Sequence, residues 1–238
     1  MQTTNDLIAE RKKDYRNILT TQFVVIVVYF TLKDVFSILG LNVLIEYINI
    51  FYLLAVATYF FLLWDLIRNF TENKFLIKAT FVILIIDYAL GILGENPFSP
   101  LIVNARPYYF FIHSTLMLIE WIAISYAIGD LFNENQNTTD KLWCSAALYL
   151  MIGISFGSMY DLINIIHPGS FGKDIHIGFP SYIEGIYYSM QIQGAGTPPY
   201  ANASSLHASV AVLQAVWNNL YMVLLIGRIL VLPEPKVR

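Results

Sequence analysis

The sequence predicts an all-α membrane protein in which six helices cross the bilayer. Of its 238 residues, 57% are hydrophobic and only 13% are charged, whereas an average soluble domain carries roughly 25% charged residues. The hydrophobic residues are gathered into long continuous runs instead of alternating with polar ones, and this pattern favours spanning helices over barrel strands. The lipid bilayer is therefore the first partner that the composition predicts.

Six runs reach the length of about 20 mostly apolar residues that a spanning helix needs. They cover residues 18–39, 43–67, 75–94, 108–132, 142–166 and 206–232. Short polar breaks such as FNENQNTTD separate neighbouring runs and are typical of loops. The first four runs form one expected membrane domain at 18–133, between a polar N-terminal tail at 1–17 and a second membrane domain at 140–232. Residues 233–238 would form a short C-terminal tail.

Basic residues are distributed unevenly between the two ends of these runs. Eleven fall on one side of a six-span arrangement: Arg11, Lys12, Lys13, Arg16, Arg68, Lys74, Lys78, Lys141, Arg228, Lys236 and Arg238. The other side receives only Arg106 and Lys173, and Lys33 lies within the first run. Because cytoplasmic loops carry the excess of Lys and Arg, both termini are expected in the cytoplasm.

The segment between the fifth and sixth runs, from about His167 to Ser205, is too apolar for a simple loop. Its stretch FPSYIEGIYYSM, at 179–190, is rich in aromatic residues. These residues would rise about 18 Å as a helix, which cannot cross a hydrocarbon core of about 30 Å. A short helix that enters the membrane and returns is therefore expected. The following QIQGAG, at 191–196, should line water if it lies at membrane depth.

Six spans, a re-entrant helix before the last one and a Gly-X-Gly after it resemble the tetrameric potassium-channel superfamily, and most closely its short bacterial members. The stretch SVAVLQAVWNNLYMVLLIGRIL, at 209–230, is similar to the inner helix of that family. The resemblance covers about residues 142–232 and implies a pore helix at 179–190, a filter at 191–196 and an inner helix at 206–232. It implies a passive potassium channel in the bacterial inner membrane, built as a homotetramer. Permeant monovalent cations, rather than a cofactor, would be its ligands.

The resemblance assigns the filter positions residue by residue. Gln191 and Ile192 stand at two threonine positions, Gln193 at a valine, Gly194 and Gly196 at the two glycines, Ala195 at a tyrosine, and Thr197 at the pore-mouth aspartate. Filter carbonyls replace the hydration shell of the permeating ion, so four copies of 191–196 are expected to surround one axis. Because the threonine and tyrosine side chains are missing, a non-selective cation channel is an alternative.

Other polar residues within the runs are candidates for a pore or for structural bonds. Glu184 lies in the predicted pore helix, where it would serve the pore or brace a neighbouring loop. Asn218 and Asn219 lie midway along the last run, where at least one should face a watery cavity, a subunit contact or another helix. Asp87 and Glu120 lie deep in the third and fourth runs, as the acids of a proton-coupled transporter would.

The remaining polar residues are interpreted more simply. Asp161 is expected at the outer membrane interface, and the four histidines, His113, His167, His176 and His207, in loops or at interfaces. The single cysteine, Cys144, excludes an intrachain disulfide. The sequence contains no metal-binding spacing, catalytic constellation, repeated voltage-sensor arginines or large basic patch, so neither an enzyme nor a nucleic-acid partner is predicted. A non-conducting sensor or scaffold built on a channel fold is the remaining alternative.

Overall fold

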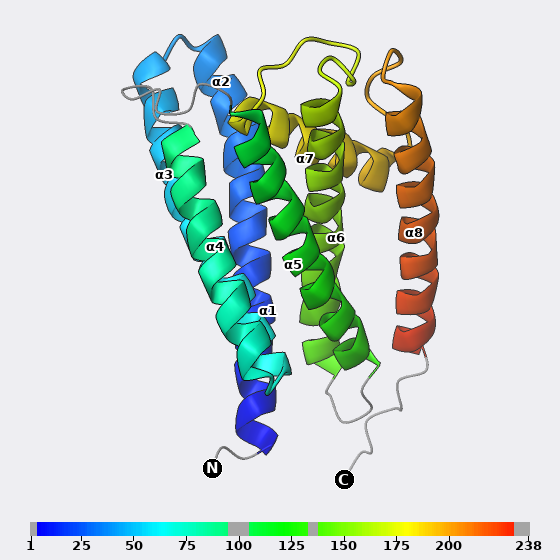
Figure 1. The fold of residues 1–238 in the computed structure, drawn as a ribbon. Helices are drawn as coiled ribbons and strands as arrows, with labels where there is room; N and C mark the ends of the chain where they lie inside the picture. Colours follow the sequence, from blue (N-terminus) through cyan, green and yellow to red (C-terminus); the bar gives the residue numbers. More distant parts are fainter. Residues whose placement is uncertain (1–3, 95–104, 133–137, 231–238) are drawn as a thin grey trace.

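The computed structural model describes residues 4–94, 105–132 and 138–230, and this part of the chain is helical without any strand (Figure 1). The long helices are α1 (Thr4–Val27), α3 (Asn42–Phe70), α4 (Lys74–Gly94), α5 (Arg106–Leu131), α6 (Thr138–Ile166), α7 (Phe179–Ala195) and α8 (Ser205–Leu230). A π-helical turn (Val28–Leu32) and the short helix α2 (Lys33–Ile38) connect α1 to α3.

Five helices of the described chain are long and apolar enough to cross a membrane, which supports the prediction of a membrane protein. The qualifying stretches are Phe51–Phe70, Lys74–Gly94, Arg106–Leu131, Lys141–Ile166 and Ser205–Leu225. The predicted first span at 18–39 is not one continuous α-helix, because it is divided among the end of α1, the π-helical turn and α2. The six-span count therefore stays a prediction.

The predicted N-terminal tail is also different in the structure, because α1 already begins at Thr4. Tyr15 is only 1% exposed, and its hydroxyl donates to Asp130 Oδ2 of α5 at 3.1 Å. Asn69 Nδ2 of α3 donates to Asp14 Oδ2 at 2.6 Å. The end of the predicted tail is thus held in the bundle by polar side chains of two other helices.

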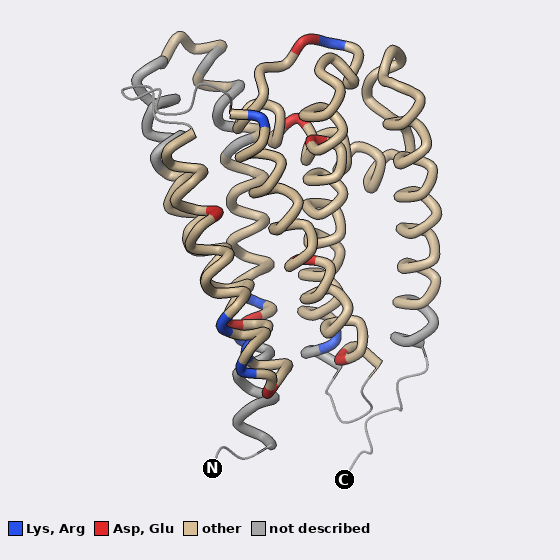
Figure 2. The backbone as a smooth tube through the Cα atoms, in the orientation of Figure 1, with Lys and Arg blue, Asp and Glu red and all other residues tan. Residues whose placement is uncertain are grey.

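The long helices other than α7 run roughly along one direction, while α7 lies obliquely near the upper end of the bundle and does not reach the lower end (Figure 1). The start of α1 and the end of α8 both lie at the lower end, on different sides of the bundle (Figure 1). Lys and Arg also gather mainly at that end, around the turn between α3 and α4 (Figure 2). This charge distribution agrees with a lower end that faces the cytoplasm.

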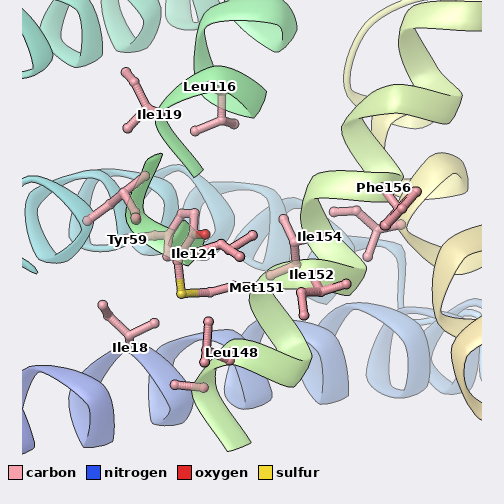
Figure 3. Close-up of a cluster of buried hydrophobic side chains, with 14 of the residues drawn as sticks. Ile18, Tyr59, Leu116, Ile119, Ile124, Leu148, Met151, Ile152, Ile154 and Phe156 are labelled. Atoms are coloured by element: carbon pink, nitrogen blue, oxygen red, sulfur yellow. The ribbon is translucent and has the colours of Figure 1, made fainter. Parts of the chain in front are cut away.

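The apolar core surrounds α6, which contacts α1, α5, α7 and α8. In its spanning stretch 67% of the residues are buried, against 17% for α4 at the edge. Figure 3 shows part of this core, where Leu148, Met151 and Ile152 of α6 meet Ile18 of α1 and Ile124 of α5. The Cys144 side chain is also fully buried here, with its Sγ 3.6 Å from the carbonyl oxygen of Ala127.

Two glycines allow α6 and α7 to approach each other closely. A Cβ atom on Gly157 of α6 would lie 2.8 Å from Ile186 Cα of α7, and one on Gly185 of α7 would collide with the carbonyl oxygen of Gly157. Gly153 and Gly157 form a GxxxG pattern, and such small residues let helix backbones come together in membranes. The contact holds α7, which is not among the five candidate spanning helices, against the central helix.

We predict that Gly185→Ala destabilises the protein, because the added methyl group meets backbone atoms that cannot rotate away. Overpacking of this kind costs about 1–3 kcal/mol, and thermal unfolding of the detergent-solubilised protein would measure the loss. The matched control is Gly194→Ala in the same helix, where a Cβ meets nothing within 4 Å. Equal stability of the two variants would contradict the close contact.

Candidate functional site

The predicted pore helix and filter differ from the structure in their boundary. Helix α7 starts at Phe179 as predicted, but it continues to Ala195, so the segment predicted as a filter forms its last turns. Gly196, with φ of 72°, ends the helix in the left-handed conformation, and its N–H donates to the Ile192 carbonyl at 2.9 Å. Gly194 has no positive φ and continues the helix. Of the two glycines in this segment, only Gly196 uses the conformational freedom of glycine, as a helix cap.

The two glutamines of this segment make different contacts. Gln193 Nε2 donates to the Tyr149 carbonyl of α6 at 2.7 Å, and the Tyr149 hydroxyl donates to the Gln193 carbonyl at 3.2 Å. Gln191 Nε2 donates to the Tyr187 hydroxyl one turn earlier, at 3.3 Å. Ile192 is buried against the core at 2% exposure. Gln193 and Ile192 therefore attach the end of α7 to the protein interior.

The residues that follow Gln193 form an exposed surface at the end of α7. Gly194, Ala195, Gly196 and Thr197 are all exposed in the single chain, and so is the adjoining Pro198. Their backbone carbonyls and the Thr197 hydroxyl are the polar groups of this surface. In the resemblance to potassium channels, Gly194 and Gly196 occupy the two glycine positions, Ala195 the tyrosine position and Thr197 the pore-mouth position.

Glu184 connects α7 to the loops on both sides of it. One carboxylate oxygen forms an ion pair with Lys173 Nζ at 3.0 Å, and the other accepts a hydrogen bond from the Tyr200 hydroxyl. Lys173 Nζ also donates to the Tyr200 hydroxyl at 2.8 Å. Burial and the Glu184 carboxylate raise the pKa of the Tyr200 phenol above its ordinary value of 10.0. Glu184 is expected either to serve the pore or to brace a neighbouring loop, and these contacts match the second role.

The neighbouring asparagines of α8 differ in burial, because consecutive residues of a helix are turned by about 100° around its axis. Asn218 is 8% exposed and lies on the inner face, whereas Asn219 is exposed among apolar residues such as Leu220 and Val216. The inner face also carries Gln214, whose Oε1 accepts from the Tyr160 hydroxyl at 3.0 Å and whose Nε2 donates to Ser189 Oγ at 2.8 Å. Helix α8 is thus attached through polar side chains and presents an apolar outer face with one amide.

Asp161 and His113 are not exposed to solvent, because both are buried between α5, α6 and α7, while their place at a membrane interface stays a prediction. His113 Nδ1 pairs with Asp161 Oδ2, and Ser181 Oγ donates to Asp161 Oδ1. Asn164 Nδ2 donates to the same Ser181 Oγ at 2.9 Å, and Ser170 Oγ donates to Asn164 Oδ1 at 3.3 Å. These five side chains form one polar network, which we call the α6 network.

A sequence pattern could have indicated this network. Ser155, Ser158, Asp161 and Asn164 recur at every third position of an otherwise apolar helix, and all four are fully buried. Residues three apart lie on neighbouring positions of one helix face, so the pattern marks a polar stripe inside a membrane segment. The partner His113 carries no comparable signal, because it comes from another helix.

His207 is also not exposed to solvent, while its place at a membrane interface stays a prediction. Its side chain is fully buried, and its ring centroid lies 5.4 Å from that of Tyr160, 4.5 Å from Phe171 and 5.5 Å from Tyr188. Its Nδ1 lies 3.1 Å from Ser204 Oγ. This aromatic cluster fastens the start of α8 to α6 and α7.

Asp87 and Glu120 belong to separate contacts. Asp87 Oδ2 accepts from the Thr115 hydroxyl at 2.8 Å, and Glu120 Oε1 accepts from the Tyr59 hydroxyl at 2.8 Å. Both carboxylates are buried, and each has a second oxygen without a hydrogen-bond partner. No group of three or more His, Cys, Asp or Glu side chains that could share a metal ion occurs within the described ranges.

These features define a helical membrane protein with a buried polar network and a short helix between two helices that are long and apolar enough to span. Comparisons with protein-family models, curated protein sequences and solved structures gave no match to this chain. The function is therefore inferred from the geometry and from the resemblance described for residues 142–232.

We predict that Asp161→Ala strongly destabilises the protein, because it leaves His113 and Ser181 without their common acceptor. Removing one partner of a buried ion pair costs about 3–5 kcal/mol, which a thermal unfolding midpoint in detergent would register. Asp174→Ala, at an exposed loop position, is the control and should leave the midpoint unchanged. An Asp161→Ala midpoint as high as that of the control would contradict a structural role for the network.

We predict that Glu184→Gln loosens the loop after α7 without unfolding the bundle. The change removes the ion pair with the partly exposed Lys173, so the global free energy of unfolding should fall by at most about 1 kcal/mol. Hydrogen exchange of residues 197–204 should become faster. Glu72→Gln, at an exposed position between α3 and α4, is the control. Unchanged exchange of that loop would show that Glu184 does not brace it.

Proposed function

We propose that the chain is the subunit of an oligomeric cation channel of the potassium-channel type, in which α6, α7 and α8 form the pore domain. One observation carries the proposal: α7 has only 17 residues. It rises about 25 Å, less than the roughly 30 Å of a hydrocarbon core, and it lies between two helices that are long enough to span. The potassium-channel resemblance implies the same order of elements: a long helix, a short re-entrant helix and a second long helix.

The exposed end of α7 is the proposed site of ion selection. Carbonyl groups at a helix C-terminus carry a partial negative charge, which favours a nearby cation. In an assembly of four chains, the carbonyls of Gly194, Ala195 and Gly196 and the hydroxyl of Thr197 would surround the axis. Gln193 and Ile192 would hold this segment to the interior of each subunit. With no threonine ring and no tyrosine, discrimination between potassium and sodium would be weak.

The outer face of α8 is the proposed lining of the cavity below this site. A lone amide on an apolar face is unfavourable against lipid and favourable against water. Four copies of Asn219 around an axis would keep a passing cation hydrated. Asn218 would stay inside each subunit, because its side chain is buried against the bundle.

The direct test is a planar-bilayer recording from purified protein of known oligomeric mass, with potassium on one side and sodium on the other. Current that reverses near the potassium equilibrium potential would support a selective channel. Current that reverses near zero would support a non-selective channel. Absence of current from an oligomer of verified mass would overturn the proposal that the protein conducts ions.

We predict that Asn219→Asp raises single-channel cation conductance several-fold, because a ring of carboxylates concentrates cations in the cavity. Single-channel recording at low ionic strength measures this effect best. Asn218→Asp is the matched control: it places the same charge on the buried face and should lower thermal stability instead. A conductance that responds to position 218 and not to 219 would contradict the proposed lining.

A non-conducting sensor or scaffold on the same fold is the second candidate. The observation that favours it is the helical conformation of residues 191–195, which leaves no extended filter strand in the single chain. This alternative requires that the hydrogen bonds between Gln193 and Tyr149 persist in the oligomer. The bilayer recording separates the two candidates.

A further inference from the structure

A second cavity lies at the other end of α7, between α3, α4, α5 and the start of α7. Its volume is about 100 Å³, more than a single water molecule needs. Tyr52 of α3, Asp87 and Tyr88 of α4, Tyr109 of α5 and Phe179 of α7 are among the side chains that line it. The proposed ion site at the C-terminal end of α7 uses none of these residues.

Asp87 is the acidic group of this cavity, and its hydrogen bonds are incomplete. The side chain is 1% exposed, and its Oδ1 has no hydrogen-bond partner. Its Oδ2 faces the Thr115 hydroxyl, which also lies 2.7 Å from the Phe111 carbonyl and 3.0 Å from the Ile112 carbonyl. A hydroxyl has one proton to donate, so Asp87 shares that proton with two other acceptors. A carboxylate buried in this way calls for a donor or a positive charge.

The described side chains around the cavity can offer Asp87 at most one positive charge, that of His113. His113 is the only basic side chain among the described residues that line it, and its Nδ1 already pairs with Asp161. The described lining contains no Lys or Arg. A cation bound beside Asp87 would therefore come from outside the chain.

The walls of the cavity indicate which cation would fit. The rings of Tyr52 and Phe179 lie with their centroids 4.0 Å apart, and Tyr88, Tyr109 and Tyr182 add further aromatic surface. Aromatic faces attract cations, and cages of such rings recognise alkylated ammonium groups. A bare alkali ion instead needs several oxygen ligands to replace its hydration shell, whereas Asp87 offers one free oxygen. The chemistry favours an organic ammonium ion over potassium or sodium.

We propose that this cavity binds a small organic ammonium ion, with Asp87 as the counter-ion and the surrounding tyrosines and Phe179 as the aromatic walls. The site is independent of the proposed pore, because no residue of the exposed end of α7 or of the outer face of α8 takes part. Its ligand is either a free alkylammonium ion or the ammonium headgroup of a lipid.

The test measures the thermal unfolding midpoint of the purified full-length protein in an uncharged maltoside detergent. Choline should raise the midpoint saturably, because a ligand that binds the folded state stabilises it. Its neutral isostere 3,3-dimethylbutan-1-ol should not, and neither should potassium chloride at equal ionic strength. An equal shift with the neutral alcohol or with potassium chloride, or no shift with choline, would overturn the proposal without reference to any variant.

Three variants test the named residues. Asp87→Asn keeps the shape of the side chain and removes its charge, so it should abolish the choline effect. Tyr88→Leu should bind choline roughly tenfold more weakly, whereas Phe75→Leu, at an exposed position of α4 outside the cavity, should bind it as the wild type does. Choline binding by Asp87→Asn at wild-type strength would overturn the assignment of the counter-ion.

Nanodiscs distinguish the two sources of the ammonium group. In discs of phosphatidylglycerol alone, added choline should stabilise the protein. A second measurement in phosphatidylcholine discs then decides: continued stabilisation by choline identifies a site for the free ion, and loss of the effect identifies a site already filled by the lipid headgroup. Absence of a choline effect in the phosphatidylglycerol discs would overturn the proposal.

Discussion

Polar side chains inside an apolar helical bundle must find their partners within the protein, and this constraint organises the structure around α6. An unpaired polar group at that depth has no water to bind. Asp161 meets the need by accepting from Ser181 and pairing with His113, so that α5, α6 and α7 are joined at one point. The position of α7, and with it every group at its two ends, depends on this junction.

Helix α8 is held by a different balance of forces. Its inner face contacts α6 and α7 through Gln214 and His207, while most of its outer face is apolar and exposed. Hydrogen bonds have a direction and a fixed length, so they determine how α8 is rotated about its axis. This rotation decides that Asn219, and not Asn218, is available to an assembly of several chains.

The sequence predicts the spanning helices well and the polar interior poorly. A bilayer imposes length and composition on each segment separately, so five apolar runs coincide with five helices of the structure. The start of α7 at Phe179 is predicted correctly, but its end is not, because Gly194 continues a helix where the resemblance implies a filter. The pairing of His113 with Asp161 depends on how two helices are placed relative to each other, which no local pattern reports. Only the stripe from Ser155 to Asn164 carried a readable signal.

The burial of Cys144 has a practical consequence for the study of assembly. The thiol is fully enclosed beside the Ala127 carbonyl, and modification requires an accessible thiolate. The native chain therefore contributes no background in labelling with maleimide dyes or nitroxides. A cysteine introduced at a single exposed position of α8 would carry the only reporter in each subunit. Spectroscopic distances between such reporters would then test whether the chains assemble, and with what symmetry, without altering the native interior.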